Sequence, residues 1–184
     1  MKNTLLSIGH GYSAKALAKR LLGKGWRIMG TTRSPEKASA LEKTGVEAVV
    51  WPGEPLPFEE VSHILTSVSP GADGDPVLAA HAFEIAGASH LKWVGYLSTT
   101  GVYGDHQGDW VDEDTALTPS TERGIARVKA EAEWTSLGVP LHIFRLAGIY
   151  GPGRGPFSKV RSGKARRIIK DGQVFSRTHL DDIA

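Results

Sequence analysis

The sequence predicts an α/β fold in which a doubly wound parallel sheet carries helices on both faces. Short apolar runs alternate with segments of helical periodicity along the chain of 184 residues. A glycine-rich turn lies between the first apolar run and the first helical segment, and the chain contains no cysteine. The length suits one domain with its own core, and the composition excludes disulfide bonds and cysteine-based metal sites.

The elements follow one another in a regular order. We expect strands at residues 5–8, 27–30, 46–51, 64–68, 92–98 and 141–145. Helices are expected at residues 12–22, from Ser34-Pro35 onward, at about 76–88 and at 121–137, since a capping serine followed by proline is typical of a helix start. A doubly wound sheet of this kind has the strand order 3-2-1-4-5-6. The polar loop at residues 104–119 is long enough to predict a functional role.

The turn at residues 9–14 fits the pattern G-x-G-x-x-A. Gly9 would permit the tight turn, Gly11 would let the backbone approach a pyrophosphate, and Ala14 would allow close helix–strand packing. Free N–H groups at the helix start, around Tyr12 and Ser13, would face the phosphates. The position of the turn between strand and helix predicts a dinucleotide-binding Rossmann domain, the alternative being a glycine-rich turn without a ligand.

The end of the second strand indicates which dinucleotide binds. An NAD site places an acidic residue there for the ribose 2′-hydroxyl, and this segment has none. Arg33 offers a charged fork to a 2′-phosphate, and Thr32 and Ser34 add hydroxyl donors. We therefore expect NADP rather than NAD, the alternative for Arg33 being an exposed residue at a helix start.

Charge and composition restrict the partners. The formal net charge is +2 and no apolar stretch approaches the ~20 residues of a membrane span. No histidine spacing suggests a metal site. We expect a cytoplasmic protein with a small-molecule substrate and no nucleic-acid or membrane partner, and a homodimer is compatible with the sequence. A basic run without any acid is expected to be a solvated face, or to meet a substrate phosphate: Arg154, Lys159, Arg161, Lys164, Arg166, Arg167 and Lys170.

Three further segments, taken with the glycine turn, resemble a known family. They read Leu-Ser-Thr-Thr-Gly-Val-Tyr-Gly at 97–104, Phe-Arg-Leu-Ala-Gly-Ile-Tyr-Gly-Pro-Gly at 144–153 and His-Leu-Asp-Asp at 179–182. The chain is similar over its whole length to the extended short-chain dehydrogenase/reductase superfamily, whose members are often called NAD-dependent epimerase/dehydratase-like proteins. One departure is Ile8, which occupies the position of the first glycine in that family.

The resemblance implies a catalytic set of Ser/Thr, Tyr and Lys, the last two spaced Y-x-x-x-K. It places Thr99 at the first position and Lys129 at the last, where the lysine holds the nicotinamide ribose. Ile125 falls at the tyrosine position and cannot exchange a proton. The alternatives are that Ile125 packs on the sheet with Val128 and Ala132, and that Lys129 is solvated.

Two further expectations follow for catalysis. Tyr103 is a candidate substitute acid, although a tyrosine in such a loop more often packs at the loop base. The family's dehydratases carry an Asp-Glu pair after the threonine, where this chain has Thr100 and Gly101, so sugar-nucleotide dehydration is not expected.

These observations lead to one domain prediction and two functional hypotheses. Residues 1–184 would form an NAD(P)-binding Rossmann domain in which 151–184 begin a substrate lobe, with Asp181 or Asp182 capping a final helix and the rest of the lobe lacking. The first hypothesis is an NADP-dependent oxidoreductase or epimerase-like enzyme acting on a small polar, sugar-derived molecule, as Thr99, Lys129 and Arg145 favour. The second is a non-catalytic NADP(H)-binding redox sensor or regulator, as Ile125 favours.

Overall fold

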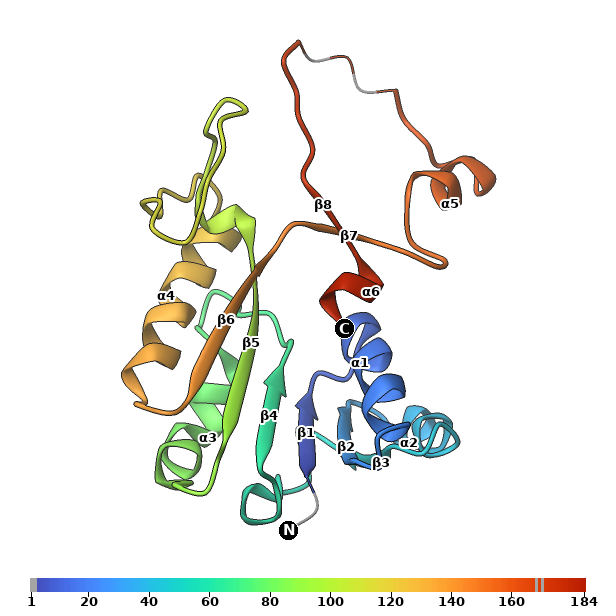
Figure 1. Cartoon of the computed structure of the whole chain (residues 1–184), viewed down its shortest axis with the longest axis vertical. Helices are drawn as coiled ribbons and strands as arrows, with labels where there is room; N and C mark the ends of the chain where they lie inside the picture. The colour runs from blue at the N-terminus through green and yellow to red at the C-terminus, as the bar shows by residue number, and fades with distance from the viewer. Residues whose placement is uncertain (1–2, 168, 170) are drawn as a thin grey trace.

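A six-stranded parallel sheet forms the centre of the molecule (Figure 1). The computed structural model describes residues 3–167, 169 and 171–184, so Lys170 of the basic run lies outside the described residues. The strand order β3-β2-β1-β4-β5-β6 and the parallel pairing of all neighbours confirm the predicted class and topology. The strands are β1 (Thr4–Ile8), β2 (Arg27–Thr32), β3 (Glu47–Val50), β4 (His63–Thr66), β5 (Trp93–Thr99) and β6 (Leu141–Leu146).

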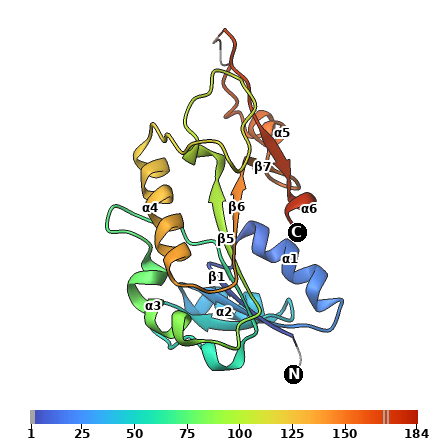
Figure 2. The same cartoon turned by 60° about the vertical axis from the view of Figure 1, so that its left-hand side comes forward.

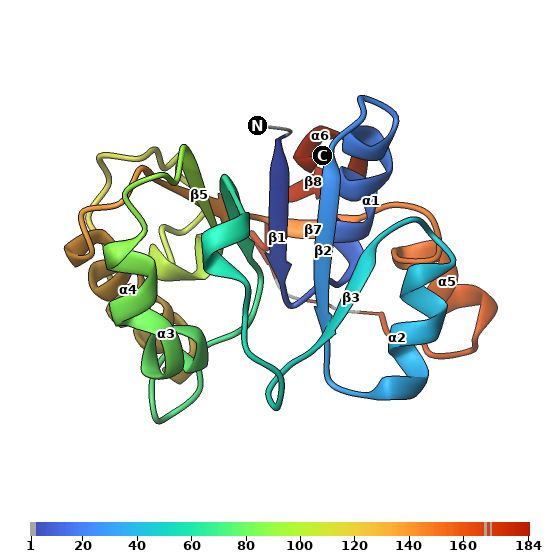
Figure 3. The same ribbon diagram turned by 90° about the horizontal axis from the view of Figure 1, so that it is seen from below.

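Helices cover both faces of this sheet. Figures 1 and 3 show α1 and α2 on one side and α3 and α4 on the other. The side chains of β1 explain this division, because successive residues of a strand point to opposite faces. Leu5 packs in the cluster of α1 and α2, whereas Leu6 packs in that of α3 and α4. The helices are α1 (Tyr12–Leu22), α2 (Pro35–Glu42), α3 (Pro76–Gly87) and α4 (Glu122–Ser136), with short 3-10 turns η1 (Phe58–Glu60) and η2 (Thr100–Val102).

A buried carboxylate joins α3 to α4. Asp75 is 2% exposed and caps α3, accepting hydrogen bonds from Val77 N at 2.8 Å and Leu78 N at 3.3 Å. Its other oxygen accepts a hydrogen bond from Trp134 Nε1 of α4 at 3.0 Å. Because both oxygens of the carboxylate have partners, Asp75 fixes the two helices against the same face of the sheet.

Strand β2 extends past the predicted end at residue 30. A Cβ atom at Gly30 would lie 2.9 Å from both His10 Cγ and Val46 Cγ1. The glycine is therefore a site of close packing within the strand rather than its end.

The last segment lies beyond the carboxyl ends of the main strands (Figure 2). It contains β7 (Gly148–Tyr150), α5 (Pro156–Arg161), β8 (Arg177–His179) and α6 (Leu180–Ile183), with β7 and β8 paired in parallel. His179 caps α6, accepting a hydrogen bond from Asp181 N on Nδ1 at 3.3 Å, so the predicted cap at Asp181 or Asp182 is wrong. Arg20 of α1 donates a hydrogen bond to Asp181 O at 3.0 Å and attaches this helix to the Rossmann domain. That residues 151–184 begin a substrate lobe remains a prediction.

The described residues contain neither a membrane-spanning helix nor a metal-binding cluster. No helix in this part of the chain is long and apolar enough to cross a membrane. No group of three or more His, Cys, Asp or Glu side chains in it could hold a metal ion.

Candidate functional site

The glycine turn after β1 is held by its neighbours on both sides. Gly9 has φ +78°, and its N–H donates a hydrogen bond to Thr31 Oγ1 of β2 at 2.8 Å. The hydroxyl of Ser67, which follows β4, donates to Gly9 O. A Cβ at Gly9 would lie 2.9 Å from Val68 Cγ2, so both the backbone conformation and the packing require glycine here.

Neither packing nor backbone conformation requires a glycine at position 11, in contrast to position 9. Its φ is −97°, and a Cβ there would meet only Gly9 O at 3.6 Å, an ordinary contact. No side chain caps the N-terminus of α1, and its first turn carries no acidic residue. The free N–H groups of this helix start are therefore open to an anion, and the protein alone does not need glycine at position 11.

A hollow of about 470 Å³, here named the central cavity, opens beside this turn. It lies where the strand order reverses between β1 and β4, which is the usual ligand position in doubly wound sheets. Of the predicted site residues, Gly9, Gly11, Tyr12, Ser13 and Thr99 meet there. Arg154 of the basic run also lines the cavity, as its possible contact with a substrate phosphate requires. The other polar and charged lining residues were not predicted as site residues and come from the ends of β4 and β5 and from α4: Ser67, Ser69, Ser98, Thr100, Arg123 and Arg127.

Helix α4 presents arginines to the central cavity rather than Lys129. Arg123 and Arg127 line it, and the next residue at the same spacing, Glu131, is buried on the same side of the helix. Residues four apart share a helix face, whereas residues two apart point about 160° away from each other. Lys129 therefore points elsewhere: its side chain is 65% exposed and lies 3.7 Å from Glu133.

Ile125, like Lys129, does not line the central cavity. It is 56% exposed and, with Lys129, lines a separate cavity beside the loop at residues 70–74. The expectation that Ile125 packs on the sheet is wrong, because Ala130, Glu131 and Trp134 of α4 are buried there instead.

Arg127 is anchored at the cavity wall by neutral groups. Its Nη1 donates to Leu97 O at 2.8 Å and to the Tyr96 hydroxyl at 3.0 Å, and its Nη2 donates to Ser69 Oγ at 3.0 Å. The guanidinium also lies over the Tyr96 ring, 5.4 Å from its centroid. No carboxylate in the described part of the chain pairs with Arg127, so its charge is not neutralised within the protein.

Tyr103 is placed as a packing residue. It is 5% exposed, its hydroxyl accepts a hydrogen bond from Arg145 Nη1 at 3.0 Å, and the guanidinium lies 5.1 Å from the ring centroid. It does not line the central cavity. Thr99 does, and its Oγ1 accepts a hydrogen bond from Gly101 N at 3.2 Å. The structure therefore favours the packing alternative for Tyr103.

A second hollow of about 750 Å³, here named the lysine cavity, lies between α1 and α2. Thr32 lines it with three lysines that the sequence analysis missed, Lys15, Lys19 and Lys37. Arg33 is exposed just outside it and makes no hydrogen bond or ion pair with the described residues, and Ser34 precedes α2 as its N-cap. None of the described residues lining the lysine cavity is acidic.

His10 forms the buried wall of the lysine cavity. The residue is 9% exposed, and neither ring nitrogen has a partner among the described residues. Burial, and secondarily the charge of Lys15, lower the pKa of His10 to about 4. The imidazole is therefore neutral at physiological pH.

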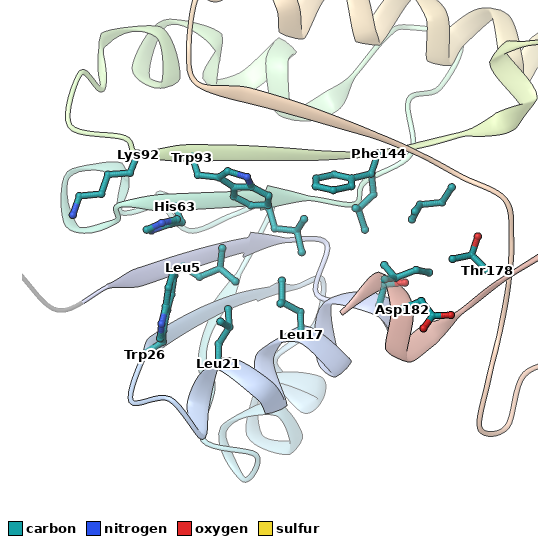
Figure 4. A pocket seen from close by; sticks show the side chains of 15 residues that line it. Leu5, Leu17, Leu21, Trp26, His63, Lys92, Trp93, Phe144, Thr178 and Asp182 are labelled. Atoms are coloured by element: carbon teal, nitrogen blue, oxygen red, sulfur yellow. The ribbon is translucent and has the colours of Figure 1, made fainter. Parts of the chain in front are cut away.

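A third hollow has a mostly apolar lining and shares Ser13 with the central cavity. It measures about 580 Å³ and separates α1 from the face of the sheet (Figure 4). Figure 4 shows Leu17 and Leu21 of α1 on one side and Trp93 and Phe144 on the other. The one histidine of its described lining is His63, whose Nδ1 lies 2.8 Å from Ser62 Oγ. Lys92 and Asp182 are its charged lining residues, and most of the remaining lining is apolar.

Comparisons with known proteins agree with this architecture. No family model matches the chain. Protein YeeZ of Escherichia coli K12 is 28% identical over 191 residues, covering 96% of this chain and 68% of that protein. A solved structure of a functionally unknown conserved protein from Silicibacter pomeroyi is 56% identical with a TM-score of 0.94, covering 99% of this chain and 65% of that one. The chain thus spans about two thirds of the length of these relatives.

Structures of described function show the same fold at lower identity. UDP-glucuronic acid 4-epimerase from Bacillus cereus, solved in complex with NAD, is 19% identical with a TM-score of 0.75, covering 97% of this chain and 70% of that one. The solved structures that the chain resembles include NAD-dependent epimerases, dehydratases and short-chain dehydrogenase/reductase proteins, and the chain has the fold of that family.

Proposed function

We propose that the chain binds a nicotinamide dinucleotide in the central cavity, with the diphosphate at the N-terminus of α1. The observation that carries this proposal is Gly11. Packing does not demand a glycine there, whereas a diphosphate approaching the uncapped helix start would. Arg154, whose guanidinium lies 5.4 Å from the Tyr12 ring centroid beside the turn, would add a positive charge. The Bacillus cereus epimerase of the same fold was solved with NAD.

The proposed dinucleotide is NADP(H). A 2′-phosphate would lie at the end of β2, between Thr32 and Arg33, where no acid is available to take a 2′-hydroxyl. The lysine cavity supports this choice, because three lysines without an acidic neighbour in its described lining favour an anion.

Thr99 and Arg127 would meet the nicotinamide half of the cofactor. The resemblance gives the ribose contact to a lysine of α4, and Arg127 is the basic residue of that helix anchored in the central cavity. A guanidinium can donate hydrogen bonds to ribose hydroxyls as an ammonium does. In this proposal Arg127, rather than Lys129, fulfils that role.

The reaction we propose is hydride transfer between NADP(H) and a small polar substrate, as in an oxidoreductase or epimerase-like enzyme. One observation favours the non-catalytic alternative, a redox sensor or regulator. The described lining of the central cavity contains no His, Asp, Glu, Lys or Cys, and its one tyrosine, Tyr12, donates its hydroxyl to Pro152 O at 2.8 Å. A proton donor would then have to come from the substrate, from water or from other parts of a longer protein.

Calorimetric titration with NADPH and NADH tests the binding proposal. We expect NADPH to bind at least about tenfold more tightly, since a charge-assisted phosphate contact contributes about 1.5–3 kcal/mol. Arg33→Asp should weaken NADPH far more than NADH. The matched control is Lys24→Asp, a charge reversal in the exposed turn before β2, at the end of that strand opposite Arg33. Equal losses for both cofactors would refute the NADP assignment, and absence of binding by either would refute the proposal itself.

A further inference from the structure

We propose that the substrate of the central cavity carries an anionic group, a carboxylate or a phosphate, which Arg123 and Arg127 of α4 bind together. This inference rests on the proposed function, because it takes the cavity as the reaction site. It assigns the recognition of that group to Arg123 and Arg127, which neither the resemblance nor the comparisons do.

The two arginines are arranged as a pair. They are four residues apart on α4, so their side chains leave the helix on the same face, and both line the central cavity. Three of the five N–H donors of Arg127 have protein partners, all of them neutral oxygens. Arg123 makes no hydrogen bond or ion pair with the described residues, so all its donors face solvent or ligand.

The surrounding charge is not balanced. None of the described residues that line the central cavity is an Asp or a Glu. The two nearby buried carboxylates have their own partners: Asp75 caps α3 and binds Trp134, and Glu131 binds Arg145. Glu122 adjoins Arg123 in sequence, and both line the cavity beside residues 70–74, but the structure shows no ion pair between their side chains. Uncompensated cations in a partly enclosed hollow favour an anionic ligand.

The cofactor leaves Arg123 available, together with the N–H donors of Arg127 that have no protein partner. Arg154 and the start of α1 are the groups beside the glycine turn, where the diphosphate is proposed to lie. Even if Arg127 donates a hydrogen bond to the ribose, Arg123 keeps a planar fork that suits bidentate contact with a carboxylate or phosphate.

The chemistry of arginine restricts what the pair can do. A guanidinium stays protonated in proteins and cannot exchange a proton as a tyrosine does. At this position it can bind an anionic substituent and orient it towards the nicotinamide, and it can stabilise negative charge that develops on a neighbouring oxygen. Arg123 is thus assigned to substrate recognition and not to acid–base catalysis.

Anion binding to the cofactor-saturated protein tests this assignment. Inorganic phosphate and malonate are titrated separately at constant ionic strength in KCl, with saturating NADP⁺, and binding is followed by calorimetry and by the rise in Tm. We expect saturable binding of at least one probe, reduced about 10-fold or more by Arg123→Gln, while Lys24→Gln leaves it unchanged. Preference for phosphate or for malonate then separates a phosphorylated substrate from a carboxylate substrate.

The outcomes separate the two proposals. Cofactor binding without saturable anion binding, or anion binding that Arg123→Gln does not weaken, overturns the anionic-substrate inference and leaves the proposed function standing. If NADP⁺ does not bind, the proposed function fails, and the same titration of the free protein still decides whether Arg123 holds an anion. Arg123→Lys should restore part of the phosphate affinity, because it keeps the charge and loses the fork.

Discussion

Arg145 of β6 and Glu131 of α4 form an ion pair in which the carboxylate is buried and the guanidinium half-buried, with Nη2 2.9 Å from Oε2. Arg145 Nε lies 3.1 Å from the same oxygen, and the Ser98 hydroxyl of β5 donates a hydrogen bond to Oε1. The pair fixes the rotation of α4 against the sheet. Because Arg127 and Arg123 precede Glu131 at intervals of four residues, the same rotation directs both arginines to the central cavity.

Glu131→Gln should therefore destabilise the fold as well as the site. The Glu131 side chain is 4% exposed, and removing one partner of a buried pair leaves the other charge uncompensated. We expect the free energy of unfolding to fall by about 3 kcal/mol, measured by urea denaturation. The control is Glu133→Gln, which removes the exposed pair with Lys129 and should cost less than about 1 kcal/mol. Similar losses in the two variants would show that the Arg145–Glu131 pair does not hold α4.

The two glycines of the turn should respond differently to alanine. Gly9→Ala is expected to lower stability by about 1–3 kcal/mol, because of the positive φ and the close approach to Val68. Gly11→Ala should leave stability within about 0.5 kcal/mol and weaken dinucleotide binding about 10-fold or more, since its methyl group would meet only the ligand. Thermal unfolding and calorimetry on the same samples give both quantities. Unchanged cofactor affinity in Gly11→Ala would contradict a diphosphate at this helix start.

The register of α4 can be tested with one pair of variants. Arg127→Gln should weaken dinucleotide binding about 10-fold or more, because Arg127 lines the central cavity. Lys129→Gln should leave it unchanged, because Lys129 does not line that cavity. The measurement is the Kd of NADPH for each variant, with circular dichroism confirming that each is folded. A larger loss in Lys129→Gln would restore the assignment implied by the family spacing.

The sequence predicted the fold better than the site, and α4 shows why. Alternating strand and helix periodicity is a local property, so class and strand order followed from it. On α4 the buried face includes Glu131, and in the sequence an acidic residue indicates an exposed position. Its partner Arg145 lies on β6 and is not apparent from the pattern of the helix. Without knowledge of that pair, the apolar spacing on α4 predicts a buried face made of Ile125, Val128 and Ala132. The family's motif spacing, counted along the chain, then selects Lys129.

Other site residues depend on tertiary placement for the same reason. Lys15 and Lys37 are ordinary exposed helix residues in the sequence, and only the packing of α1 beside α2 brings them to the same cavity as Thr32. The glycine turn was predictable because its chemistry lies within six consecutive residues at a strand–helix junction.

The lysine cavity gives a prediction on cofactor preference. Lys37→Gln and Lys15→Gln should each lower the affinity for NADPH several-fold and leave the affinity for NADH nearly unchanged, since each removes a positive charge near the proposed 2′-phosphate. The difference should shrink at high salt, because partly exposed charges are screened. Competition titrations at about 50 mM and about 500 mM KCl measure how the difference between the NADPH and NADH affinities changes with salt. Parallel losses for both cofactors would place the phosphate elsewhere.

His10 should make stability depend on pH in a defined direction. Its pKa is lowered to about 4 in the folded protein, chiefly by burial, from about 6.5 in the unfolded chain. Below pH 6.5 the unfolded chain therefore binds a proton that the native state does not accept until about pH 4. The free energy of unfolding should fall as the pH drops through this window, by at most roughly 3 kcal/mol.

Urea denaturation between these two pH values, compared with His10→Asn, isolates this contribution. The variant should lose the part of the pH dependence that comes from His10, whereas His142→Asn, which removes an exposed histidine stacked on Trp93, should retain it. A wild-type slope that His10→Asn does not reduce would mean that the pKa of His10 is not lowered in the native state, so that the imidazole becomes protonated below about pH 6.5. A positive charge at His10 would then add to those of Lys15 and Lys37, and the cavity would attract a phosphate more strongly than the neutral ring allows.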